Sequence, residues 1–116
     1  MEMETAIVRL SALAQDSRLQ IFRLLVQAGP NGMAAGEIAK ALAIPANTLS
    51  SHLSILANSD LVQARRVSRS RIYAAQYDAM RELLAFLLED CCQGKPEMCA
   101  PLFQLAACCP PQTTTC

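Results

Sequence analysis

The sequence predicts a mostly helical fold that contains one small β-hairpin. Apolar residues recur at helical spacing through residues 5–59 and again from residue 78, whereas residues 62–75 are partly β-branched and are interrupted by a polar turn. The composition agrees with this assignment, because the 116 residues are 53% hydrophobic and only 4% aromatic. Such a mixture favours helices over a fold dominated by sheets.

Four helices are expected before the hairpin. The first covers residues 5–13, and Asp16 is placed to cap a second helix that ends at Gly29-Pro30. An Asn31-Gly32 turn leads to a third helix over residues 34–44, and Pro45 suits the start of a fourth over residues 46–59. The apolar positions that define these helices are Ile7, Val8, Leu10, Leu13, Leu19, Ile21, Phe22, Leu24, Leu25, Ile38, Ala39, Leu42, Leu49, Leu53, Ile55 and Leu56.

The hairpin strands are expected over residues 62–67 and 71–75, and a last helix begins at Asp78. Its apolar residues follow a 3-4 spacing that is typical of a helix paired with another helix: Met80, Leu83, Leu84, Leu87, Leu88 and Cys91. Helices three and four together with the hairpin make a winged helix-turn-helix. We expect a DNA-binding and dimerisation domain over residues 1–92 and a cysteine-rich C-terminal segment and tail over residues 93–116.

The outer face of the fourth helix is small and polar rather than rich in Glu and Lys. Such side chains can approach base edges and phosphates without bulk, so Ala46, Asn47, Thr48 and Ser51 are candidate base-reading residues. Ser50 and His52 are expected to support the helix or to contact phosphate. Beside this helix, Arg65, Arg66, Arg69 and Arg71 are expected to meet backbone phosphates or the minor groove. The alternative for both elements is a polar surface that is merely solvated.

The charge distribution, the N-terminus and the lack of long apolar runs indicate where the protein is found and which partners it has. Ten basic and ten acidic residues cancel, but residues 60–77 hold four arginines and one acid. The acidic N-terminus does not resemble a secretory signal, and no apolar run approaches the roughly 18 residues that a membrane span needs. We therefore expect a cytoplasmic protein without a membrane partner, in which thiols stay reduced and six cysteines indicate metal or redox chemistry.

All six cysteines lie in two similar strings, CCQGKPEMC and CCPPQTTTC. The first holds Cys91, Cys92 and Cys99, and the second holds Cys108, Cys109 and Cys116. Thiolates are soft ligands, and trivalent arsenic or antimony bonds three sulfurs in a pyramid. Zinc usually takes four ligands, so a triplet without His favours a metalloid, although six thiols could also build a four-sulfur zinc or cadmium site. The second string is a second metalloid site, a relay that captures the inducer, a source of ligands for the other subunit, or a tail without function.

Three stretches resemble the ArsR/SmtB family of metalloregulatory repressors: LSALAQDSRLQIFRLL, AAGEIAKALAIPANTLSSHLSILANSDLV and RRVSRSRIYAAQ. The resemblance covers roughly residues 7–88 and departs at Asp60, where relatives commonly have Gly. It implies a homodimer with paired outer helices that binds an imperfect inverted repeat of double-stranded DNA and represses transcription until an inducer binds.

The resemblance also narrows the sensor site. A Cys-x-Cys pair found in the family at the start of the recognition helix is replaced here by Pro45, Ala46, Asn47 and Thr48. A transition-metal site on the last helix would need His, and His52 is the only one. A less common arsenite-responsive subgroup uses a vicinal cysteine pair at the end of the last helix plus one nearby cysteine, which residues 90–99 resemble.

The sequence therefore predicts a repressor that leaves its operator when arsenite, or alternatively antimonite, binds Cys91, Cys92 and Cys99, without an organic cofactor. A redox-sensing or a cadmium- or zinc-sensing repressor of the same fold is the alternative. A small arsenic-handling thiol enzyme is a third hypothesis, but no phosphate-binding loop or catalytic basic cluster accompanies the cysteines, so we expect a protein that is not an enzyme.

Overall fold

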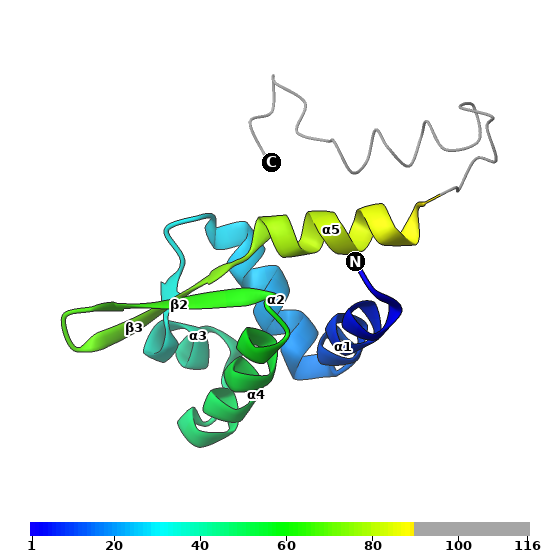
Figure 1. Cartoon of the computed structure of the whole chain (residues 1–116). Coiled ribbons are helices and arrows are strands. Elements are labelled where there is room, and N and C mark those ends of the chain that lie inside the picture. The colour runs from blue at the N-terminus through cyan, green and yellow to red at the C-terminus, as the bar shows by residue number, and fades with distance from the viewer. Residues whose placement is uncertain (90–116) are drawn as a thin grey trace. The chain divides into compact units, whose positions relative to one another are not determined.

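The computed structural model describes residues 1–89 and confirms the predicted winged helix-turn-helix (Figure 1). In chain order the elements are α1 (Met3–Leu13), α2 (Asp16–Ala28), β1 (Met33–Ala34), α3 (Ala35–Leu42), α4 (Ala46–Asn58), β2 (Val62–Val67), β3 (Ser70–Ala75) and α5 (Tyr77–Leu87). The first of two compact units ends at Leu83, within α5, and contains the whole helix-turn-helix and its wing.

The sheet has three strands rather than the two of the predicted hairpin. Its order is β1-β3-β2, and both pairings are antiparallel. The short strand β1 was missed because two residues cannot show an alternating pattern. Its approach to β3 depends on Gly32, which has a φ of 73° and lies so close that an added Cβ would stand 2.3 Å from the carbonyl oxygen of Tyr73. Only glycine fits this position.

The core lies where α2, α3 and α4 pack together against the sheet. The largest of its fully buried side chains are Ile21, Leu25, Ile38, Leu49, Leu53, Leu56 and Leu61. Six of these seven come from the predicted apolar stripes. Leu19 and Ile55 were also placed in those stripes, but they are 45% and 41% exposed, because each lies at the edge of its helix face.

Helix α1 departs from the simple apolar pattern. Its buried residues are Ala6, Arg9 and Ala12, whereas Ile7, Val8 and Leu10 are exposed. The expected cap of α2 also shifts by one position: Asp16 is the first helical residue, and the side chain of Gln15 accepts the Arg18 N–H at 2.8 Å. The side chain of Asp16 instead accepts a bond from Gln20.

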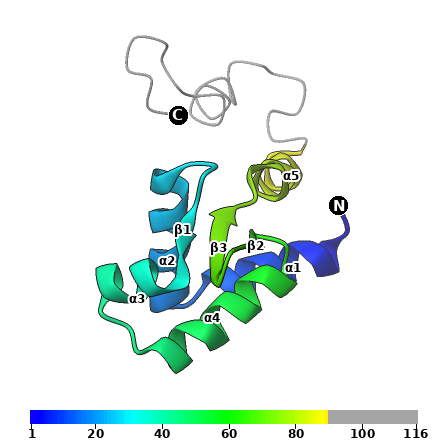
Figure 2. The same ribbon diagram turned by 90° about the vertical axis from the view of Figure 1, so that its left-hand side faces the viewer.

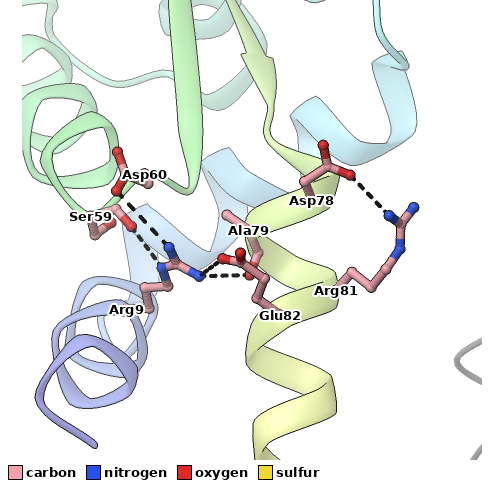
Figure 3. Close-up of polar contacts among 7 residues, drawn as sticks. All are labelled: Arg9, Ser59, Asp60, Asp78, Ala79, Arg81 and Glu82. Atoms are coloured by element: carbon pink, nitrogen blue, oxygen red, sulfur yellow. Dashed lines mark hydrogen bonds and ion pairs between the residues drawn. The ribbon is translucent and has the colours of Figure 1, made fainter. Parts of the chain in front are cut away.

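Arg9 is the buried cation that joins three helices of this unit (Figure 3). Its Nε donates to the carbonyl of Ser59, the residue that ends α4, at 3.2 Å. Its Nη1 donates to the carbonyl of Ala79 and to Oε1 of Glu82, both on α5 and both at 3.0 Å. Nε and Nη1 thus each bond inside the fold, the residue is only 6% exposed, and these bonds hold α1 against the end of α4 and the start of α5.

Asp60, where the resemblance to the ArsR/SmtB family implies Gly, has a φ of 65°. Gly adopts this left-handed conformation without a steric penalty, and Asp is one of the few other residues that adopt it at modest cost. The Asp60 carboxylate also lies 4.0 Å from Nη2 of Arg9. The acid therefore fits the turn after α4 and adds a weak attraction to the Arg9 cluster.

Replacing Arg9 with Met should lower the free energy of unfolding by about 2–4 kcal/mol, because two buried carbonyls lose their donor. Arg81→Met is the matched control, since Arg81 bonds only Asp78 in an exposed ion pair and should change stability by less than about 0.5 kcal/mol. Urea titration followed by circular dichroism measures both. Equal losses would show that the hydrogen bonds from Arg9 to the two carbonyls do not stabilise the fold.

A second pair of variants tests the close approach of Gly32, just before β1, to Tyr73 of β3. Gly32→Ala should cost about 2–4 kcal/mol through a positive φ and a collision with Tyr73. Gly36→Ala, on the exposed side of α3 with nothing within 4 Å of the new Cβ, should instead stabilise the chain by about 0.5–1 kcal/mol. Thermal unfolding distinguishes them, and a neutral Gly32→Ala variant would rule out the tight contact.

Candidate nucleic-acid interface

Helix α4 presents a polar face that has neither Lys, Arg, Asp nor Glu. Ala46, Asn47, Thr48, Ser50 and Ser51 are all exposed. The same helix buries its leucines in the core on the other side, so its orientation is fixed by packing. Figure 2 shows α4 beside α3, the two helices of the helix-turn-helix. Ala43, which caps the C-terminal end of α3, has a φ of 54° and begins the turn between them.

The first turn of α4 is favourable for an anion. Pro45 precedes it and provides no side-chain cap, so the N–H groups there keep much of their positive end charge. One of them, that of Thr48, donates to Oδ1 of Asn47 at 3.0 Å. The Asn47 side chain would have to give up this hydrogen bond in order to bond a base. The hydroxyl of Ser51 makes only a 3.5 Å contact to the Asn47 carbonyl, so it has less to give up.

The wing is a positively charged hairpin. Between Val62 and Ala75 it holds four arginines and no acid, and each arginine is exposed. Arg66 lies directly opposite Arg71 in the β2–β3 ladder. Like charges at this spacing repel each other, and a polyanion between them would remove that cost. Arg69 sits in the two-residue turn after Ser68, whose φ is 57°.

Arg65 behaves differently from the other three arginines. Its Nη2 donates to the carbonyl of Asn31 at 2.8 Å, which ties the wing to the turn after α2. It also lies on the opposite face of β2 from Arg66, since neighbouring residues of a strand alternate. Within the described part of the chain, Arg66, Arg69 and Arg71 form no side-chain hydrogen bond or ion pair. These three are therefore the wing cations best placed to bind phosphate. Arg65 instead uses its guanidinium in a contact within the fold.

His52 is half-buried and faces an arginine that the sequence pattern did not single out. Nη1 of Arg18 lies 3.5 Å from Nδ1 of His52. Nε of the same guanidinium donates to the carbonyl of Ala12 at 2.7 Å. His52 of α4 therefore contacts α2 through Arg18. Arg18 was missed because the contact spans 34 residues and depends on the elbow between α1 and α2, which no local pattern reveals.

The six cysteines lie outside the described residues, so the predicted metalloid sites stay predictions. Residues 1–89 contain no group of three or more His, Cys, Asp or Glu side chains that could hold a metal ion. No helix described by the structure is long and apolar enough to cross a membrane.

Known proteins share this arrangement. A sequence profile described as a helix-turn-helix domain matches residues 13–63. The chain is 30% identical over 89 residues to the transcriptional activator HlyU of Vibrio cholerae, covering 77% of this chain and 80% of that protein. A solved structure of reduced HlyU from Vibrio cholerae N16961 has 32% identity and a TM-score of 0.58, over 72% of this chain and 88% of that one.

A second solved structure carries a family name. Mb0332 from Mycobacterium bovis is a homodimeric winged helix-turn-helix DNA-binding domain described as a possible ArsR-family transcriptional regulator. It shares 30% identity at a TM-score of 0.63, over 74% of this chain and 78% of that chain. These relatives are DNA-binding regulators and not enzymes. The chain belongs to the ArsR family of winged helix-turn-helix transcriptional regulators.

Proposed function

We propose that the chain is a dimeric repressor that binds operator DNA through α4 and the wing. It leaves that DNA when trivalent arsenic, or alternatively antimony, binds Cys91, Cys92 and Cys99. One observation supports DNA binding: two suitable surfaces lie on neighbouring elements. They are an uncharged polar face on α4 and, on the adjacent hairpin, arginines that pair with no acid within residues 1–89. The first suits base edges, and the second suits phosphates.

A dimer is supported by the outer surface of α1. Met3, Ile7, Val8 and Leu10 are all exposed, with Met3 at 63%, which leaves much of the apolar surface of this helix without a partner inside residues 1–83. A second copy of the chain would cover such a surface, as expected from the homodimeric Mb0332. Two recognition helices related by a two-fold axis read an inverted repeat in successive major grooves.

The sensing half rests on the chemistry of the thiols. Three soft sulfur donors suit a trivalent metalloid, and they begin two residues after Glu89, close in sequence to the end of α5. The start of α5 is joined to the end of α4 by Arg9, so a rearrangement of α5 has a route to the recognition helix. The inducer must bind the DNA-free state more tightly, and a coupling of about 1–3 kcal/mol changes operator affinity about 5–150-fold.

A thiol redox sensor is the second candidate, and one observation favours it. A similar solved structure is that of HlyU in its reduced form, which defines that relative by its redox state. The adjacent cysteines of this chain could pair on oxidation in place of metalloid binding. Arsenite and peroxide therefore have to be tested separately.

Loss of one wing arginine should weaken operator binding uniformly across sequences. Arg69→Gln removes one phosphate contact, so the slope of log K against log salt should become smaller by about one unit. Arg81→Gln on α5 is the control, because Arg81 is not part of the wing or of α4, and it should leave the slope unchanged. Fluorescence anisotropy with a labelled operator at several salt concentrations measures this. An unchanged slope for Arg69→Gln would remove the wing tip from the interface.

The Cys91→Ser and Cys92→Ser variants should bind operator DNA like the natural chain but should fail to release it with arsenite. Two sulfurs cannot complete the three-coordinate site. Truncation after Cys99 should keep the response and serves as the control for the second cysteine string. Anisotropy is followed during arsenite titration under reducing conditions and during a separate peroxide titration. Release by peroxide alone would favour the redox candidate, and normal release of Cys92→Ser by arsenite would contradict the sensor assignment.

A further inference from the structure

The contact between Arg18 and His52 defines where the His52 ring carries its proton. An arginine side chain only donates hydrogen bonds, because its guanidinium stays charged and has no acceptor. Nη1 of Arg18 lies 3.5 Å from Nδ1 of His52. A proton on Nδ1 would place two N–H donors against each other. The lone pair of Nδ1 therefore faces the guanidinium, and the ring proton lies on Nε2.

Arg18 is itself held in place from several sides. Its backbone N–H is bound by the side chain of Gln15 at 2.8 Å. Its Nε and Nη2 donate to the carbonyls of Ala12 and Ser11, at 2.7 and 3.5 Å, near the C-terminal end of α1. A cation at a helix C-terminus is favourable because it meets the negative end of the helix dipole. The guanidinium cannot turn away from His52 without leaving these carbonyls.

We infer that Arg18 is a positioning residue for DNA recognition: it fixes His52 in the tautomer that carries the proton on Nε2. This tautomer presents one N–H donor from α4. Nε2 has no hydrogen-bond partner among residues 1–89, and His52 is the only ionisable side chain on the recognition helix. This inference rests on the proposed function for its acceptor, which is a phosphate oxygen or a base-edge acceptor of the operator.

A donor on α4 would act differently from the arginines of the wing. A single N–H of fixed direction contributes to register on DNA, whereas the wing arginines contribute charge.

The tautomer can be measured without DNA, since the chain has one histidine. A long-range proton–nitrogen correlation spectrum of the untagged, labelled protein, at a pH where the ring is neutral, should show a protonated Nε2 and an unprotonated Nδ1. Arg18→Met should give a mixture of both tautomers, and Arg18→Lys should restore the single form by retaining a cationic donor. A proton on Nδ1 in the natural chain, or a spectrum unaffected by Arg18→Met, would overturn the role of Arg18.

The DNA half is tested with two isosteres. The amide nitrogen of Gln reaches the position of Nε2, whereas that of Asn reaches only the position of Nδ1. His52→Gln should keep operator affinity within about threefold, and His52→Asn should lose about tenfold, the usual effect of one hydrogen bond to a charged acceptor. Equal affinities of the two variants would overturn the Nε2 donor. Failure of the natural chain to bind any operator would refute the proposed function and the DNA role of His52, but would leave the tautomer result intact.

Discussion

The buried guanidinium of Arg9 is the interaction on which the arrangement of helices depends. A charge that is 6% exposed survives only because two carbonyls and a carboxylate accept its hydrogen bonds. Those acceptors come from the end of α4 and the start of α5, so the position of the recognition helix is defined relative to both outer helices. Hydrophobic packing alone is not directional, and it would leave these helices free to slide by small amounts. Hydrogen bonds of fixed length remove that freedom.

In the proposed function, base recognition and phosphate binding belong to separate elements of this unit. Helix α4 supplies small polar side chains on a rigid leucine-anchored support, and the hairpin supplies three uncommitted arginines. Arg65 and Arg18 also make contacts within the fold, since Arg65 binds the carbonyl of Asn31 and Arg18 binds carbonyls near the end of α1. The division explains why counting basic residues overstates the phosphate-binding surface.

Much of the fold could be predicted because its signals are local. The helical spacing of Leu49, Leu53 and Leu56 and the turn at Ser68 identify α4 and the wing without knowledge of any neighbour. Contacts between distant segments could not be predicted in this way. From sequence alone, Arg9 of α1 would be interpreted as an exposed charge. In the structure it bonds residues 50 and 70 positions away. The same applies to Arg18 with His52 and to the two residues of β1. The metalloid-binding prediction concerns cysteines beyond residue 89 and stays a prediction of the sequence.

The facing pair Arg66 and Arg71 gives salt two opposing effects on this protein. In the free chain, added ions screen the repulsion between the two guanidinium groups, so the wing becomes easier to hold in its paired form. In the proposed DNA complex, the same ions compete with the wing for phosphate and weaken binding. Under the proposed function, a rise in salt therefore stabilises the free hairpin and at the same time weakens the DNA complex.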